Sequence, residues 1–131
     1  MIPRRIAFYR GPNQRRAGRA FDRELQGSGY ADVLWIFVQR WQESGYVPPQ
    51  WRHGEPGTSF AAFGPPRSTV RLYYAEHAGQ TVLLHVATGK HGRGELPERT
   101  KQLVEQRLAQ WRQWFPNGAE LDDQNRLVAR R

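Results

Sequence analysis

Apolar residues are most concentrated in the middle of the chain. Two β-rich runs at 70–77 and 80–87 flank Ala78-Gly79, the kind of pair that a tight hairpin turn with positive φ requires. The second run has no regular polar face, whereas a strand at the surface alternates apolar and polar residues. The pattern therefore predicts a central hairpin whose second strand is packed on both faces.

Helical periodicity appears on both sides of this hairpin. The segment 19–26 predicts a short helix, and 30–44 predicts a longer one with apolar residues every three to four positions and Gly45 as its C-cap. A third apolar stripe predicts a helix that begins at Pro97 and runs to Phe115. Two helices thus precede the hairpin and one follows it.

The remaining segments complete an α+β domain. Short strands are predicted at 4–10 and 58–63, and 46–57 is a loop by its three prolines and two glycines. We expect a single domain over 1–115, with a twisted, mostly antiparallel sheet of about four strands covered by two N-terminal helices and one C-terminal helix. The weakly hydrophobic stretch 116–131 is predicted to be a partly flexible tail.

Composition narrows the class of protein. The absence of cysteine among 131 residues excludes disulfides and thiolate metal sites. The first ten residues lack the apolar run of a signal peptide, and no stretch is apolar over the ~18 residues that a membrane span needs. We therefore expect a cytoplasmic protein that has no membrane partner.

The charge points to a polyanionic partner. The formal net charge is +8, and arginine supplies 18 of the 20 basic residues, a choice that suits bidentate phosphate contacts. A GC-rich genome would also favour arginine codons. Six arginines between Arg4 and Arg19, with no acid among them, form either an RNA-contacting arm or a solvated surface. Nucleic acid is the partner that this charge favours.

Two groups of residues carry candidate chemistry. Arg71 on the central strand needs a partner, which is either a scissile phosphate or a structural ion pair with Glu76 or Asp22. The loop after the hairpin holds Lys90, His91 and Arg93. Cleavage of RNA by its own 2′-hydroxyl requires a base, an acid and cations but no metal, and histidine can serve as base or acid near neutral pH.

Other residues are candidates for contacts with RNA. Trp51-Arg52-His53 combines an aromatic ring with a guanidinium and an imidazole, which suits base stacking and phosphate contact, although Trp51 could instead plug the core. Tyr73 or Tyr74 could stack on a base or be a half-buried packing residue. His85 lies in an apolar strand, so we expect it to be a hydrogen-bonded core residue.

The order of these motifs resembles the RelE/HigB superfamily of toxin endoribonucleases. The resemblance is carried by Arg71-Leu72-Tyr73-Tyr74, Val82-Leu83-Leu84-His85, Gly89-Lys90-His91 and Pro97. It implies the toxin of a type II toxin–antitoxin pair, a metal-independent and cofactor-free ribonuclease that cuts mRNA on the ribosome, binds an antitoxin and is compatible with a homodimer. It also implies catalytic roles for Arg71, Lys90 and His91. By its charge, Arg93 would bind phosphate.

One departure keeps two other hypotheses open. RelE-like proteins usually carry a Glu and an Arg near the end of the strand at 58–63, where this chain has Ala61-Ala62-Phe63. A non-catalytic nucleic-acid-binding module on the same fold would not need those charges. A phage- or transposon-derived structural protein that packs against DNA would also account for the basic composition.

Overall fold

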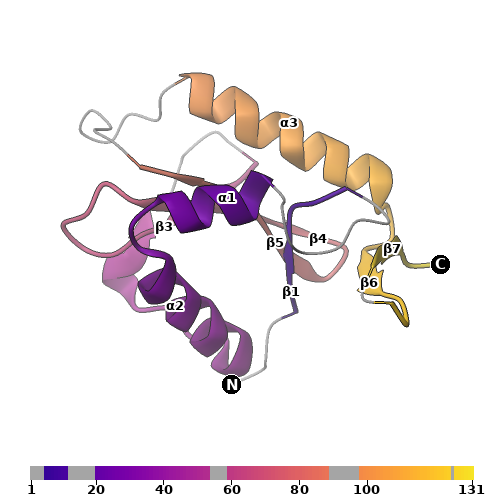
Figure 1. Cartoon of the computed structure of the whole chain (residues 1–131), viewed down its shortest axis with the longest axis horizontal. Coiled ribbons are helices and arrows are strands. Elements are labelled where there is room, and N and C mark those ends of the chain that lie inside the picture. Colours follow the sequence, from indigo (N-terminus) through magenta and orange to yellow (C-terminus); the bar gives the residue numbers. More distant parts are fainter. Residues whose placement is uncertain (1–4, 12–19, 54–58, 89–97, 125) are drawn as a thin grey trace.

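The computed structural model describes residues 5–11, 20–53, 59–88, 98–124 and 126–131 (Figure 1). Three helices are present in these ranges, α1 (Ala20–Gly27), α2 (Ala31–Ser44) and α3 (Glu98–Trp114), together with a 3-10 turn at Pro49–Trp51. The strands are β1 (Ile6–Phe8), β2 (Arg52–His53), β3 (Ala61–Phe63), β4 (Arg71–His77), β5 (Gln80–Ala87), β6 (Ala119–Leu121) and β7 (Leu127–Ala129).

The five strands of the main sheet lie in the order β1-β5-β4-β3-β2. β1 runs parallel to β5, and the other neighbours are antiparallel. This confirms the predicted α+β class with two N-terminal helices, a mostly antiparallel sheet and one C-terminal helix. The sheet has one strand more than expected, because Arg52 and His53 of the predicted loop pair with β3 as an edge strand.

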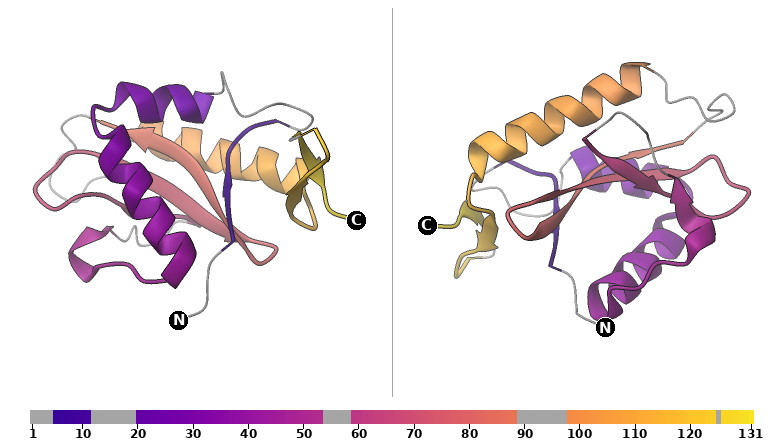
Figure 2. Two further views of the ribbon diagram at one scale, coloured as in Figure 1. Left: turned by 60° about the horizontal axis from the view of Figure 1, so that its bottom comes forward. Right: turned by 180° about the vertical axis from the view of Figure 1, so that it is seen from behind.

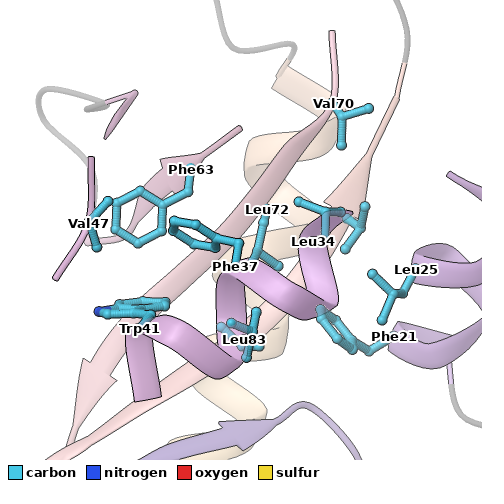
Figure 3. Packing of buried hydrophobic residues seen from close by; sticks show 12 residues of the cluster. Phe21, Leu25, Leu34, Phe37, Trp41, Val47, Phe63, Val70, Leu72 and Leu83 are labelled. Atoms are coloured by element: carbon cyan, nitrogen blue, oxygen red, sulfur yellow. The ribbon is translucent and has the colours of Figure 1, made fainter. Parts of the chain in front are cut away.

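Helices cover both faces of the sheet. α1 and α2 lie on one face and α3 crosses the other (Figure 2). Leu83 and Leu84 of β5 are both fully buried but belong to different clusters, Leu83 with Phe21 and Phe37 (Figure 3) and Leu84 with Trp111. The prediction that the second strand of the hairpin is packed on both sides is therefore confirmed.

The predicted turns and caps form as their residue types require. Ala78 and Gly79 have φ of 51° and 75°, so both central positions of the hairpin turn are left-handed. Gly45 ends α2 with φ 72°, and its N–H donates to Trp41 O at 2.8 Å.

Within the predicted tail, β6 and β7 pair with each other as a small antiparallel hairpin. Ala119 and Leu127 are buried in the cluster on the α3 face. Gln80 at the start of β5 donates to Ala119 O at 2.7 Å and accepts from Ala119 N at 2.9 Å. Two apolar residues and one buried amide side chain thus join this hairpin to the rest of the domain.

A bulge interrupts β5. Tyr73 pairs with His85 and Tyr74 pairs with Leu83, so Leu84 is an extra residue with no partner in β4. Leu84 belongs to the cluster on the α3 face, and His85 stacks on Tyr73 of that same face at 6.0 Å. The bulge thus places two consecutive side chains of β5 toward α3.

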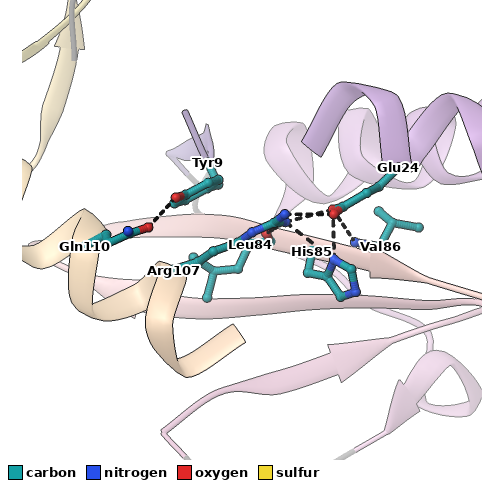
Figure 4. Close-up of polar contacts among 7 residues, drawn as sticks. All are labelled: Tyr9, Glu24, Leu84, His85, Val86, Arg107 and Gln110. Atoms are coloured by element: carbon teal, nitrogen blue, oxygen red, sulfur yellow. Dashed lines mark hydrogen bonds and ion pairs between the residues drawn. The ribbon is translucent and has the colours of Figure 1, made fainter. Parts of the chain in front are cut away.

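Where β1 no longer pairs with β5, two charged side chains cover the edge of β5 (Figure 4). β1 pairs only with Thr81, Val82 and Leu83. Further along, Arg107 Nη1 donates to Leu84 O at 2.8 Å and Val86 N donates to Glu24 Oε1 at 3.4 Å.

Glu24 and Arg107 also bind each other. Arg107 Nη1 and Nη2 reach the two carboxylate oxygens of Glu24, each at 2.8 Å. This bidentate pair connects α1 to α3 across the edge of the sheet.

His85 completes the network on Glu24. Its Nδ1 lies 2.8 Å from Glu24 Oε1, and its side chain is 12% exposed, which confirms the expected hydrogen-bonded core histidine. Burial alone would raise the pKa of Glu24, but hydrogen bonds from His85 and Arg107 and their charges outweigh it and lower that pKa. Arg107 also lies 5.0 Å from the ring centroid of Tyr9, whose pKa is raised, chiefly by burial.

Replacing Leu83 by alanine should lower the free energy of unfolding by about 2–5 kcal/mol, because it leaves a cavity in the core that the surrounding side chains cannot fill. Urea unfolding followed by circular dichroism measures this. Leu121→Ala is the matched control, since Leu121 is 55% exposed and its truncation should change stability by no more than about 0.5 kcal/mol. Equal losses in the two variants would contradict the burial of Leu83 in the core.

Replacing Glu24 by glutamine should destabilise the fold at neutral pH by on the order of 2–3 kcal/mol, less than for a fully buried pair because Glu24 is 21% exposed. Because the folded-state pKa is lowered, the stabilisation is present above the ordinary value of 4.5 and is lost as the pH falls through the lowered pKa. Urea unfolding at decreasing pH should therefore show the wild type and Glu24→Gln converging. A constant gap down to strongly acidic pH would refute the assignment.

Candidate nucleic-acid interface

Arg71 begins β4 and is half-buried at the end of the sheet. Its Nη1 donates to Ser68 O at 2.9 Å and to Val70 O at 2.8 Å. Within the part of the chain that the structure describes, Nη2 and Nε form no hydrogen bond and Arg71 forms no ion pair, so the structural pairing with Glu76 or Asp22 is not made. The guanidinium is held by two carbonyls and keeps donors for an anion.

His53 of β2 lies beside Arg71. Its Nε2 is 3.3 Å from Gly64 O, and a Cβ added to Gly64 would lie 2.9 Å from Arg71 Nη1 and 2.1 Å from Val70 O. Only glycine lets the chain pass this closely. Gly64 N in turn donates to Trp51 O at 2.9 Å, so one glycine joins the three elements that carry the site.

The environment favours the neutral form of His53. Burial lowers its pKa below the usual 6.5, the nearby Arg71 charge lowers it further, and the bond to Gly64 O opposes both. If Nε2 donates to Gly64 O, the lone pair is on Nδ1. A neutral imidazole beside a fixed guanidinium can take a proton from a hydroxyl while the cation stabilises a developing phosphate charge.

Arg52 and Trp51 directly precede His53 in the chain. Arg52 is exposed and pairs with Phe63. It borders a cleft of about 300 Å³ that His53, Trp41, Tyr74 and Glu76 also line. Trp51 stacks on Phe37 at 4.5 Å with an interplanar angle of 5°, so Phe37 covers one face of its indole ring. Arg52 can therefore contact phosphate from solvent, whereas Trp51 retains at most one face for a base.

Tyr73 requires a correction. It is 1% exposed, forms an edge contact with Phe60 at 5.7 Å and stacks on His85. Its ring is therefore inaccessible to a base, and the predicted RNA contact is wrong for this residue. The reason is the alternation of β4, which turns Tyr73 toward the face of the sheet that α3 covers.

The predicted basic loop, with Lys90, His91 and Arg93, lies outside the described residues. Its point of departure from the sheet is known, because Arg71 pairs with Ala87 at the end of β5. His91 and Lys90 therefore remain predicted catalytic residues, and Arg93 remains a predicted phosphate contact.

No group of three or more metal-ligating side chains occurs among the residues whose positions are described. Of the described helices, none is long and apolar enough to cross a membrane.

Comparison with known proteins leaves the family open. No protein-family model matches the chain, and no curated protein matches it. The resemblance to RelE/HigB toxins thus rests on the motifs in the sequence and remains a prediction.

Sequence reasoning missed the partnership of His53 with Arg71. The two residues are 18 positions apart, and the prolines and glycines around His53 indicated a loop. A usable signal was the short run Trp51-Arg52-His53 between breakers, which is long enough for a two-residue edge strand opposite Ala62 and Phe63. Pairing with that strand brings His53 next to Gly64 and Arg71.

The pKa of His53 should lie below 6.5 and should rise when Arg71 is replaced by methionine, because the substitution removes a neighbouring positive charge. A titration of the imidazole resonances by NMR measures both values. Arg112→Met, which removes the same charge from the exposed side of α3, should leave the pKa unchanged. A pKa at or above the ordinary value, or equal shifts in both variants, would show that Arg71 does not act on His53.

Proposed function

We propose that this protein is the toxin of a type II toxin–antitoxin pair and acts as a metal-independent endoribonuclease on mRNA. The observation that carries the proposal is the pairing of a neutral His53 with Arg71, whose guanidinium is held at the strand end with donors to spare. The net charge of +8 supports an RNA substrate. The resemblance to RelE/HigB toxins supplies the substrate class and places cleavage on the translating ribosome.

The chemistry needs a base, a cation and an acid. Nδ1 of His53 takes the proton of the 2′-hydroxyl, whose oxygen attacks the adjacent phosphorus. Arg71 stabilises the charge that grows on the phosphoryl oxygens. His91, in the role predicted from the sequence, protonates the departing 5′-oxygen. The products are a 2′,3′-cyclic phosphate and a new 5′-hydroxyl end, and Lys90, Arg93 and Arg52 bind flanking phosphates.

The second candidate function is binding of nucleic acid without cleavage. It is favoured by the edge of β3, where Ala61 is half-buried and Ala62 is 1% exposed. The two charges that RelE-like proteins usually place on this strand are thus absent. A binder would lose at most ~1–3 kcal/mol for each arginine removed, whereas a nuclease would lose most of its rate.

Induced expression in a bacterium tests the choice. The wild type should stop growth and create new 5′-hydroxyl ends inside translated messages, whereas Arg71→Ala, His53→Ala and His91→Ala should reduce cleavage by roughly a hundredfold or more. Arg112→Ala should cleave like the wild type at equal protein level.

Thermal melting of each purified variant separates lost chemistry from lost folding. Normal growth of cells that express the wild type would reject the nuclease. So would growth arrest by the folded Arg71→Ala and His53→Ala variants without new RNA ends. Either result would leave a binding or structural protein.

A further inference from the structure

The outer side of α2 is unusually apolar. Among the described residues, five large hydrophobic side chains are exposed, and four of them lie on α2 or next to it: Tyr30 at 39%, Val33 at 45%, Ile36 at 50% and Tyr46 at 52%. Residues 30, 33 and 36 follow helical spacing on the side away from the core. In the left view of Figure 2, α2 lies in front of the sheet and nothing described covers its outer side. Grouped exposed apolar residues usually mark a contact surface.

Three of these residues, Val33, Ile36 and Tyr46, border a groove of about 480 Å³ between α2 and the segment that follows it. Its walls are Val33, Ile36, Phe37, Arg40, Tyr46 and Trp51. The parallel stack of Trp51 on Phe37 gives the groove a rigid floor. From Val33 to Ser44 it extends about 16 Å along the helix, the length of about three helical turns of an occupant.

We propose that the groove, defined by these six residues, binds an amphipathic helix of a partner protein whose flanks are acidic. An apolar groove along a helix suits the apolar stripe of a second helix. Arg40 is exposed on the rim beside Val33 and Ile36 and offers a cation to a flanking carboxylate, while Glu43 further along would accept one basic residue.

Charge distinguishes an acidic helix from the two other possible occupants of the groove, a second copy of this chain and RNA. A second copy of this chain would bring +8 against +8, which opposes self-association, whereas an acidic helix is attracted. RNA is also attracted by the net charge, but the groove itself has one arginine and one glutamate among apolar walls and cannot follow a phosphate backbone. The partner is an antitoxin if the proposed function holds, and only that identity rests on the proposed function.

The test is a selection from a phage-displayed library of random 16-residue helical peptides on the full-length protein. We expect enriched peptides to carry apolar residues at i, i+3, i+4 and i+7 and a net negative charge. Their dissociation constants should rise at least about tenfold on Ile36→Glu and stay unchanged on Leu121→Glu. Both variants replace a hydrophobic residue that is at least half exposed and carry the same net charge. The general attraction of an acidic peptide to a basic protein is therefore the same for both.

Arg40→Glu should weaken the same peptides at least several-fold more than Arg112→Glu, its charge-matched control. The proposal is overturned if no enriched peptide distinguishes Ile36→Glu from Leu121→Glu, or if the enriched helices are basic. It is also overturned if sedimentation shows a wild-type dimer that Ile36→Glu dissociates, or if a single-stranded oligoribonucleotide loses affinity on Ile36→Glu alone. If the wild type binds these peptides but neither arrests growth nor cuts RNA, the helix-binding proposal stands and the proposed nuclease function is rejected.

Discussion

The rest of the structure depends on how β5 satisfies its backbone hydrogen bonds along the edge that β1 leaves unpaired. β1 pairs with only three residues of β5, yet the strand continues through the centre of the molecule with both faces buried. Backbone groups left without partners there would cost about 1–3 kcal/mol each. Glu24 and Arg107 supply hydrogen bonds to Val86 N and Leu84 O and neutralise one another. The same contact fixes α1 and α3 relative to the sheet.

The bulge at Leu84 connects this network to the candidate site. In the unbulged part of the hairpin His77 pairs with Gln80, and the same register continued without a bulge would set Arg71 opposite Val86. The extra residue sets it opposite Ala87. The bulge therefore determines which side chain of β5 reaches Glu24 and which residue of β5 lies beside Arg71. The guanidinium of Arg71 itself is held by the carbonyls of Ser68 and Val70.

The sequence predicts what depends on local pattern and misses what depends on distant contacts. The hairpin turn, the C-cap at Gly45 and the burial of β5 could be predicted, because the residue types at these positions favour few other conformations. Glu24 and Arg107 are 83 residues apart, and nothing in either segment shows that they meet. Tyr73 failed as a base-stacking residue for the same reason, since α3, which covers its face of the sheet, comes from a distant part of the chain. The partnership of His53 with Arg71 required an edge strand too short to have a periodicity.

The segment after α2 brings the proposed RNA site and the proposed partner groove together. Trp51 forms the floor of the groove and His53, two residues later, faces Gly64 and Arg71. Gly64 N is bonded to Trp51 O, and Gly64 O is the partner of His53 Nε2. A displacement of Trp51 by a helix in the groove would thus reach the histidine through one glycine, whose contacts leave no space for a side chain. Two hydrogen bonds through Gly64 therefore join the floor of the groove to His53.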